Sequence, residues 1–447
     1  MRIGIQAWGS EGDIRPLIAL GHGLVERGHD VELVYTDIAD RNYEAVASAL
    51  GMRVSAVATP VVADINETYR IGLEIIRARD PLTQARIIVN EFLKPVERQL
   101  FEAATDLCAR SDFLVGHFIL HHLHAAAELA GKPEVSVTFA HTMLPSRYIH
   151  PQGTPRLGEL GNLVGWRIAR LGINLVMRPD INRFRARVGL RPIKDLLLDG
   201  WASHLLNLIA VPPALCAGPR DWPAWNKVCG FLALPPTSHE AVSPALAKFI
   251  AVGPPPVFMG FGSLMPWQSS HLTETVALLK EAARMADCRA VIQAEEEASP
   301  SPRLPGDDRV IIVSRTPHAQ VFPHCAAVVH HCGAGTTHTT LKAGVPSVPV
   351  PHVSDQFQWA DELRRVGVAP AAIARRRLTA ARLAARIRET VENTRFRENA
   401  RQVQARMKDD DGPRTAARMI ESAFAAHRPL RRDRGLESTG RDRGHEV

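Results

Sequence analysis

Short apolar runs alternate with helical segments from the first residues of the chain, and this alternation restricts the possible folds more than any other feature. Ile3–Ala7, Val31–Tyr35 and Arg53–Val57 are predicted strands, with helices between them at Pro16–Arg27 and Ala39–Leu50. Strands and helices that alternate through short connections form parallel, doubly wound sheets. Such sheets bind ligands beyond the carboxyl ends of their strands, so the residues that follow each strand are candidates for a site.

Length and composition favour an ordinary globular protein of two domains. The chain has 447 residues, of which 45% are hydrophobic and 23% are charged. The first residues enter a strand directly and no apolar run reaches the roughly 20 residues of a membrane span, so neither a signal peptide nor a transmembrane helix is expected. The six cysteines form no CxxC pair, which favours reduced thiols in the cytoplasm.

The net charge of +7 favours anionic partners. No RNA-binding motif accompanies this charge, and nucleic acid is therefore not expected as a partner. A nucleotide sugar fits, and a peripheral contact with an anionic membrane is also consistent with the charge. Some of the charge lies in the tail at 428–447, which has few apolar residues and is predicted to be disordered.

The stretch from Ala326 to Gln356 combines a strand, a turn of small residues and a helix. Ala326–Val329 is typical of a buried parallel strand, and His330–Gly335 (His-His-Cys-Gly-Ala-Gly) forms the turn. Thr336 can cap the helix that follows and can also offer its hydroxyl to a phosphate oxygen. Helix N-termini carry free amides and partial positive charge, and small residues let a phosphate approach the backbone. The stretch therefore predicts a phosphate site.

The same stretch resembles the nucleotide-sugar motif of family-one glycosyltransferases. The resemblance runs in order through HHCGAGTT, LKAGVPSVPVP and the pair Asp355–Gln356. It is most similar to the bacterial and fungal sterol glucosyltransferases and to the antibiotic and rhamnolipid sugar transferases. Two residues depart from the common pattern: Cys332 stands where many bacterial relatives have glycine, and His338 replaces a residue that is usually small.

A second resemblance lies in the loop after the first predicted strand. GSEGDIRP, at residues 9–16, is similar to the GSRGDVxP signature of the sterol and glycopeptide transferases. The resemblance implies that Asp13 is the base that activates the acceptor hydroxyl. Asp13 also suits the N-terminus of a helix whose first turn contains Pro16, and the two roles are compatible. Glu11 replaces the family's arginine, and a carboxylate close to Asp13 would raise the pKa of the base.

The resemblance implies an α/β protein with the GT-B fold, in which two doubly wound Rossmann-like domains face each other. It also implies a metal-independent inverting transfer of a hexose, with UDP-glucose favoured as donor and a sterol, lipid or natural-product aglycone as acceptor. No cofactor is expected, because the nucleotide sugar is a co-substrate. The predicted divisions are an acceptor domain at 1–233, a linker at 234–255, a donor domain at 256–411, a helix at 412–427 that returns to the first domain, and the tail.

Several residues receive roles from the family pattern. The base is Asp13, and Gly12 lies on the acceptor side. His117 and His141 are assigned to the acceptor cleft from their positions directly after predicted strands. The donor side is assigned to Ser263, Thr316, Pro317, His318, His331, Gly333, Ala334, Gly335, Thr336, Asp355 and Gln356.

Other interpretations stay open at this stage. His117 or His141 can assist or replace Asp13 as base. The spacing of His117 and His121 suits a metal, although no acidic or cysteine partner follows at a matching spacing. Asp355 can be a helix cap instead of a sugar ligand. Two amphipathic helices, broken near Pro81, are expected at 66–109, either beside the acceptor or simply packed on the sheet.

Two other function classes compete with the transferase. One is a non-catalytic protein that keeps the nucleotide site, and the other is a nucleotide-sugar epimerase. The pairing of GSEGDIRP with Asp355–Gln356 disfavours the epimerase. The non-catalytic protein is disfavoured because Asp13, His331, Asp355 and Gln356 are all retained. Asp13→Asn separates a transferase from a binding protein, because only the transferase loses turnover.

Overall fold

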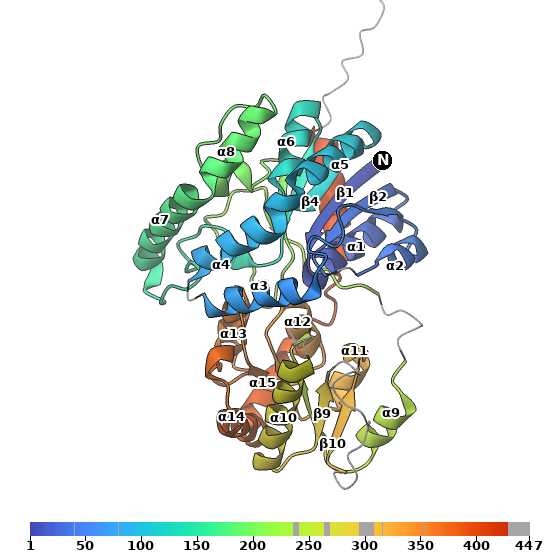
Figure 1. The fold of residues 1–447 in the computed structure, drawn as a ribbon, viewed down its shortest axis with the longest axis vertical. Coiled ribbons are helices and arrows are strands. Elements are labelled where there is room, and N and C mark those ends of the chain that lie inside the picture. Colours follow the sequence, from blue (N-terminus) through green and yellow to red (C-terminus); the bar gives the residue numbers. More distant parts are fainter. Residues whose placement is uncertain are drawn as a thin grey trace, which may run out of the picture.

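A computed structural model describes residues 1–39, 41–78, 80–235, 241–262, 269–294, 308–314, 316–353 and 355–427, which form two parallel sheets (Figure 1). In these residues the first sheet has seven strands in the order β3-β2-β1-β4-β5-β6-β7, and the second has five in the order β10-β9-β8-β11-β12. The first sheet comprises β1 (Arg2–Gly9), β2 (Asp30–Asp37), β3 (Arg53–Ala56), β4 (Phe113–His117), β5 (Glu134–Thr138), β6 (Leu206–Ile209) and β7 (Asn226–Val228). The second comprises β8 (Val257–Gly260), β9 (Ala290–Gln293), β10 (Val310–Val313), β11 (Ala327–His330) and β12 (Ser347–Pro349).

Helices surround each sheet, as expected for doubly wound domains. The first sheet is accompanied by α1 (Glu11–Val25), α2 (Glu44–Ala49), α3 (Ile65–Arg77), α4 (Pro81–Ile88), α5 (Glu97–Arg110), α6 (His121–Ala130), α7 (Gly158–Val176) and α8 (Arg178–Arg187). The second is accompanied by α9 (Pro244–Ala251), α10 (Ser269–Met285), α11 (His318–Val321), α12 (Ala334–Lys342), α13 (Gln356–Arg365), α14 (Ala380–Glu392) and α15 (Thr394–Arg406), and the last helix is α16 (Gly412–His427). The shorter turns are η1 (Val89–Leu93), η2 (Lys94–Val96), η3 (His141–Met143), η4 (Leu196–Gly200), η7 (Phe322–His324) and η8 (Arg375–Arg377).

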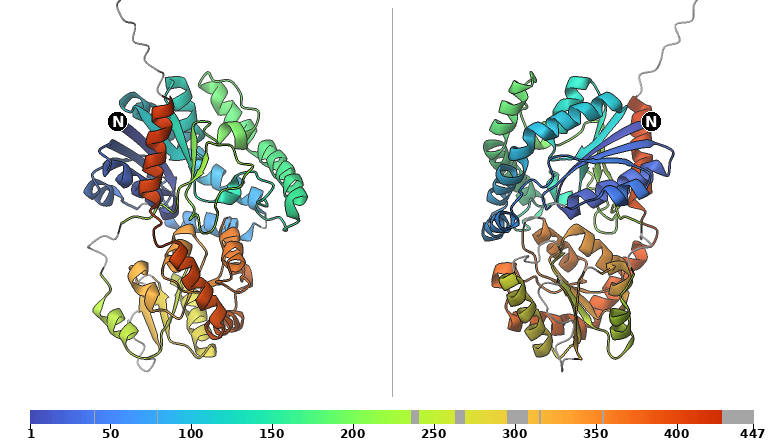
Figure 2. Two further views of the ribbon diagram at one scale, coloured as in Figure 1. Left: turned by 180° about the vertical axis from the view of Figure 1, so that it is seen from behind. Right: turned by 45° about the vertical axis from the view of Figure 1, so that its right-hand side comes forward.

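Helix α16 leaves the second sheet and packs on the first (Figure 2). Ala416, Ala417 and Ile420 of α16 are buried in the same core as the strands β1, β2 and β4. A β-carbon at Gly23 of α1 would lie 2.8 Å from the carbonyl oxygen of Pro413, so only glycine lets the two helices approach this closely. Outside the core, Glu421 accepts a hydrogen bond of 2.6 Å from Arg27. The last helix therefore ties the two halves of the chain together.

A buried apolar cluster also joins the two halves. Ile209 and Leu215 from the first half pack with Leu341, Trp359 and other residues of the second. Above it, the ring of His338 stacks on that of Phe231 with centroids 4.2 Å apart. The unusual residue of the motif thus packs against the end of the first half.

The structure corrects several predicted elements. Helix α1 begins at Glu11, so Pro16 lies inside the helix and not in its first turn. The 66–109 region holds three α-helices, α3 to α5, where two were predicted. The predicted linker contains α9, whose Leu246 is buried against the second sheet. The short strand β12 lies at the sheet edge, which is where a strand ending in Pro349 is tolerated.

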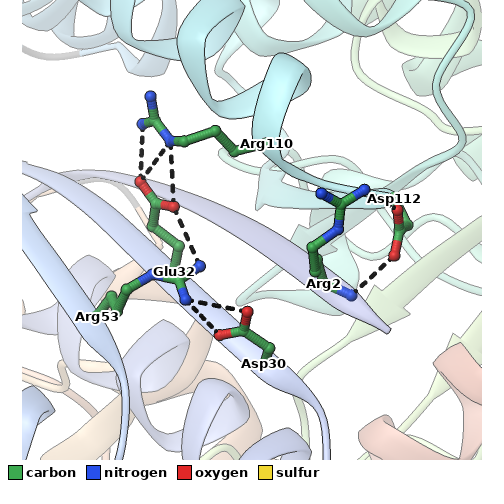
Figure 3. A network of polar contacts seen from close by, with 6 residues as sticks. All are labelled: Arg2, Asp30, Glu32, Arg53, Arg110 and Asp112. Atoms are coloured by element: carbon green, nitrogen blue, oxygen red, sulfur yellow. Dashed lines mark hydrogen bonds and ion pairs between the residues drawn. The ribbon is translucent and has the colours of Figure 1, made fainter.

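Ion pairs cover the amino ends of the first sheet's strands (Figure 3). Glu32 accepts hydrogen bonds of 2.7 Å from Arg110 and 3.4 Å from Arg53, and Arg53 also donates to Asp30 at 2.7 Å. At the start of β1 the backbone and side chain of Arg2 both donate to the carboxylate of Asp112, at 3.0 and 2.7 Å. Each carboxylate at this edge therefore has a cationic partner.

Candidate active site

Asp13 lies directly beyond the carboxyl end of β1, in the first turn of α1. Ser10 precedes the helix, and both its amide and its hydroxyl donate to Oδ2 of Asp13, at 2.8 and 2.9 Å. Gly9 adopts a φ of +131° there, and a β-carbon would lie 2.5 Å from the same oxygen. Asp13 thus performs the capping role that its position predicts, and it does so with one carboxylate oxygen.

Burial raises the pKa of Asp13, against the two hydrogen bonds from Ser10, which lower it. A further increase comes from Asp37 at the end of β2. Glu11, the carboxylate that replaces the family's arginine, is paired with Arg15 at 3.1 Å. A carboxylate whose pKa is raised is a stronger base when ionised, which suits proton abstraction.

The turn before α12 has the geometry of an anion cradle. Cys332 adopts a φ of +65°, a left-handed conformation that explains why glycine is common at this position. Gly333 precedes the helix, and the first intrahelical bond is from Thr337 to Gly333 at 2.9 Å. The amides of Ala334, Gly335 and Thr336 therefore have no acceptor within the helix. Thr336 is the third residue of α12, so the prediction that it caps the helix is wrong.

His331 is held against the glycines of this turn. A β-carbon on Gly333 would lie 2.4 Å from Nε2 of His331, and one on Gly262 would lie 2.9 Å from its Cε1. Burial lowers the pKa of His331 to about 4. The imidazole is therefore neutral at pH 7, and a neutral imidazole has one N–H that can donate a hydrogen bond.

Asp355 and Gln356 lie at the start of α13, but their side chains make different hydrogen bonds. Within the described residues, the Asp355 side chain caps no amide of the helix. Gln356 is buried, and its Oε1 accepts hydrogen bonds from the amides of His352 and Val353 at 2.8 and 3.2 Å. The side-chain oxygen of Gln356 thus shapes the turn, whereas the Asp355 carboxyl lies next to the Trp359 side chain, which lowers its pKa against the effect of burial.

The carboxyl edges of the two sheets face each other. Burial raises the pKa of Asp355 to about 6, and the charge of Asp13 from the other half of the chain is the second cause. Glu11 and Arg15 of α1 likewise influence the pKa of His318, which burial lowers to about 4. The predicted base and the predicted sugar ligand are therefore close enough to interact electrostatically.

Thr316, Pro317 and His318 follow β10 as predicted. The His318 ring stacks on Phe322 with centroids 4.6 Å apart, and its Nε2 is 2.7 Å from Oε1 of Gln293. In the described part of the chain, the buried hydroxyl of Thr316 has no hydrogen-bond partner, and neither has Nδ1 of His331. Buried polar atoms without partners are costly, so these two atoms are expected to meet a ligand or water.

The residues assigned to the acceptor side differ in exposure and in their contacts. Gly12 is exposed, and a β-carbon there would touch only the Ser10 hydroxyl, at 3.7 Å, so the space above this turn is open. His117 ends β4 with its ring stacked on Phe139 at 4.9 Å, and burial lowers its pKa to about 3. His141 follows β5 and its Nε2 is 4.0 Å from Glu362 of the second half. Ser263 lies outside the described residues.

One group of side chains has donor atoms close enough to share a metal ion, in the residues that the structure describes. It consists of Glu97, His121 and His122, whose atoms lie within 4.8 Å of one another; His117 does not take part. Glu97 is already paired with Arg187. The group belongs to α5 and α6, and Glu97 and His121 line a cavity together with residues such as Lys94 and Trp201, whereas Asp13 is not among its lining residues.

The sequence interpretation missed three residues that support the site. Ser10 holds the Asp13 carboxylate, and the Ser-x-x-Asp spacing of a capping box would have identified it. Asp37 and Gln293 end β2 and β9, where the carboxyl edge of each sheet places functional side chains. Neither residue belongs to a motif, so only their positions at strand ends gave a signal.

Comparisons with known proteins agree with this geometry. Residues 276–422 match the model of the erythromycin biosynthesis protein CIII-like C-terminal domain. The chain is 30% identical over 444 residues to the O-mycaminosyltylonolide 6-deoxyallosyltransferase of Streptomyces fradiae, with 96% of this chain and all of that protein aligned. It is 29% identical to a sterol 3-beta-glucosyltransferase of Arabidopsis thaliana, but it spans only 62% of that protein's length.

Solved structures show the same fold at lower sequence identity. The glycosyltransferase VinC in complex with DTDP has a TM-score of 0.64 and 19% identity, with 95% of this chain and all of that chain covered. The glycotransferase of kitacinnamycin gives the same TM-score and identity, covering 94% and 98% of the two chains. The fold is therefore GT-B, as predicted. Together with the full-length relative, these findings show that the chain belongs to the family-one glycosyltransferases.

Proposed function

We propose that the protein transfers a hexose, with inversion, from a nucleoside-diphosphate sugar to a hydroxyl group of an apolar acceptor. The observation that carries this proposal is the opposition of Asp13 and Asp355 across the two sheets. In this proposal Asp13 is the base at the carboxyl edge of one sheet, and Asp355, at the carboxyl edge of the other, binds the sugar. The amides at the start of α12 lie beside α13, the helix that follows Asp355. A donor and an acceptor held between these groups would have their reacting atoms aligned.

In the proposed reaction, Asp13 removes the proton of the acceptor hydroxyl as its oxygen attacks the anomeric carbon. The bond between that carbon and the diphosphate oxygen breaks, and the nucleoside diphosphate leaves with the electron pair. Inversion follows because attack and departure occur on opposite faces. A positioned base contributes about 10²–10⁴-fold to the rate.

The leaving diphosphate gains negative charge, which the amides at the start of α12 and the neutral His331 would stabilise. Thr336 lies in the first turn of α12, with its hydroxyl at the same helix end. Ser263 is included on resemblance alone. These donors supply the stabilisation for which other enzymes use a metal ion, so we propose a metal-independent reaction with no cofactor.

Two donors deserve comparison. UDP-glucose is proposed first, from the resemblance of the two motifs to the sterol enzymes. A thymidine-diphosphate deoxyhexose is the second candidate, because the relative aligned over its full length is a 6-deoxyallosyltransferase and VinC was solved with DTDP. Thr316–His318 would lie under the base and ribose in either case. The names of the relatives likewise support two acceptor classes, sterols and macrolide-type aglycones.

A cytoplasmic location is part of the proposal. All six cysteines are free thiols, which is typical of a reducing compartment.

The test is product analysis by mass spectrometry with a matrix of donors and acceptors. UDP-glucose and a thymidine-diphosphate deoxyhexose are each offered with sterols, hydroxy-lipids and macrolide aglycones, and nucleotide binding is measured by calorimetry. We expect one hexose adduct, which is absent in Asp13→Asn although that variant still binds the nucleotide. An adduct that persists in Asp13→Asn would exclude Asp13 as base. Nucleotide binding without any adduct would favour a non-catalytic role, and failure to bind either nucleotide would refute the proposal.

A further inference from the structure

Helix α7 has its polarity reversed relative to a normal surface helix. Its exposed side carries large apolar residues, with Leu160 79%, Ile168 66%, Leu171 70% and Leu175 74% exposed, and Leu163 and Val164 extend the same face. These residues follow the spacing of one helical stripe. Contiguous exposed apolar surface of this kind marks an interaction site in folded proteins.

The buried side of α7 is built from polar groups that are satisfied. Asn162 donates to the carbonyl oxygen of Arg147 at 2.8 Å, and the indole of Trp166 donates to that of Ile149 at 2.7 Å. Asn174 donates to Asp195 at 3.1 Å and accepts from the amide of Leu196 at 2.8 Å. These bonds fix the rotation of the helix, so its leucine-rich face points away from the protein.

The position of α7 leaves this face open. The helix lies on the outer flank of the first half, beside α4 and α8, in both orientations (Figures 1 and 2). Its inner contacts are made by Gly172, which approaches Leu82 of α4, and by Gly165, which approaches Pro151. In the described part of the chain, no helix is long and apolar enough to cross a membrane. The stripe therefore suits a surface contact and not a span.

The charge of α7 selects among possible occupants. Between Glu159 and Asp180 the chain contains three arginines and no carboxylate. Arg170 is paired with Asp195, whereas Arg167 is exposed within the stripe and makes no ion pair with a described residue. A second copy packed on this face would add its own Arg167 to the interface, and the stripe offers no acid to compensate the two charges. An anionic lipid surface accepts both the apolar side chains and the cation.

We propose that α7 is a membrane-docking helix that lies in the interface of a lipid surface containing anionic headgroups. Leu160, Ile168, Leu171 and Leu175 insert among the acyl chains, and Arg167 extends to the headgroups. The docking goes beyond the glycosyl transfer and does not depend on which acceptor is used.

The test uses the full-length protein and sedimentation with vesicles of phosphatidylcholine, alone or with phosphatidylglycerol. We expect binding to the anionic vesicles, and a loss of about tenfold or more in the variant Leu160→Gln/Ile168→Gln/Leu171→Gln. Glutamine is a good helix former, so α7 should persist. Arg167→Gln is expected to weaken binding to the anionic vesicles by about fivefold. The control Val252→Gln/Val391→Gln changes two other exposed apolar residues and should bind like the original protein.

The other outcomes overturn the proposal. Equal binding by the α7 variant would assign the contact to another surface, such as the arginine-containing segment at 428–447, which every variant retains. Absence of vesicle binding, together with a dimer that the α7 substitutions dissociate in ultracentrifugation, would make this face an interface between copies. Absence of both would refute a membrane role, and unchanged nucleotide binding would show that the variants are folded.

Discussion

The two edges of the first sheet carry the same types of side chain but use them in opposite ways. At the amino edge, Glu32 and Asp112 are paired with arginines, and hydrogen bonds from those arginines lower the pKa of both carboxyls. At the carboxyl edge, the pKa of Asp13 is raised by burial, and none of the causes that act on it is an arginine. Paired charges stabilise the fold, whereas a buried carboxylate without a cation costs stability and gains basicity.

The difference between the two edges shows that unfavourable charge interactions are found at the carboxyl edge, where the candidate active site lies. Asp13, in the first turn of α1, and Asp355, immediately before α13, belong to different halves of the chain, and the charge of Asp13 raises the pKa of Asp355. A substrate placed between them would relieve this repulsion by hydrogen bonding. The following predictions test the contrast, from the largest expected effect to the smallest.

Asp13→Asn is expected to reduce kcat by about 10²–10⁴-fold, because the amide cannot accept the acceptor proton. The amide oxygen still accepts the bonds from Ser10, so the melting temperature should change little. Turnover and thermal unfolding are measured on the same preparation. Ser10→Ala is the matched variant: without the hydroxyl, the pKa of Asp13 should rise and the acidic limb of the rate profile should move to higher pH. A large loss of stability in Asp13→Asn would instead mean that capping is its main role.

Asp355→Asn is expected to change how stability depends on pH. The pKa of Asp355 in the folded protein is about 6, above its unfolded value, so the stabilisation by its proton is complete near pH 3 and is lost as pH rises through 6. In the original protein, this group should lower the free energy of unfolding by about 2 kcal/mol between pH 4 and pH 7, and the variant should not show that decrease. Chemical denaturation at several pH values measures it. An identical pH dependence in both proteins would contradict the raised pKa.

His331→Ala is expected to weaken binding of a nucleoside diphosphate by about 10-fold to 100-fold, since a hydrogen bond to a charged group is lost. Because the pKa of His331 is about 4, binding to the original protein should not weaken between pH 6 and pH 8 through this group. Calorimetry measures both quantities. His338→Ala is the control, as its ring stacks on Phe231 and does not face the cradle; it should alter stability and leave Kd unchanged.

Glu32→Gln is expected to reduce the free energy of unfolding by about 1 kcal/mol at pH 7, and by less in high salt. Its pKa is lowered in the folded state, so its contribution is present above the unfolded value and disappears as pH falls. This sign is opposite to that of Asp355. Urea unfolding at two ionic strengths checks the prediction. An effect of Glu32→Gln on turnover would contradict the view that the amino edge serves stability alone.

Much of the site was predictable because it depends on local rules. Strand ends in a parallel sheet gather functional residues, so Asp13, His331 and Asp355 could be chosen from the pattern together with the family resemblance. Local rules gave the wrong first residue for two helices, because two local signals competed there. The Ser10–Asp13 capping box started α1 before Pro16, and the left-handed Cys332 moved the start of α12 ahead of Thr336.

The sequence by itself determined the alternating strands and helices, the two motifs and the small residues at the turns, because these follow from backbone sterics and hydrophobic periodicity. Only the tertiary structure decided which charges meet. That Asp37 raises the pKa of Asp13, that Asp13 raises the pKa of Asp355, and that the apolar stripe of α7 points outward all depend on packing between distant segments. Helical periodicity shows that a helix has an apolar face, but the hydrogen bonds of Asn162 and Trp166 decide which way that face turns.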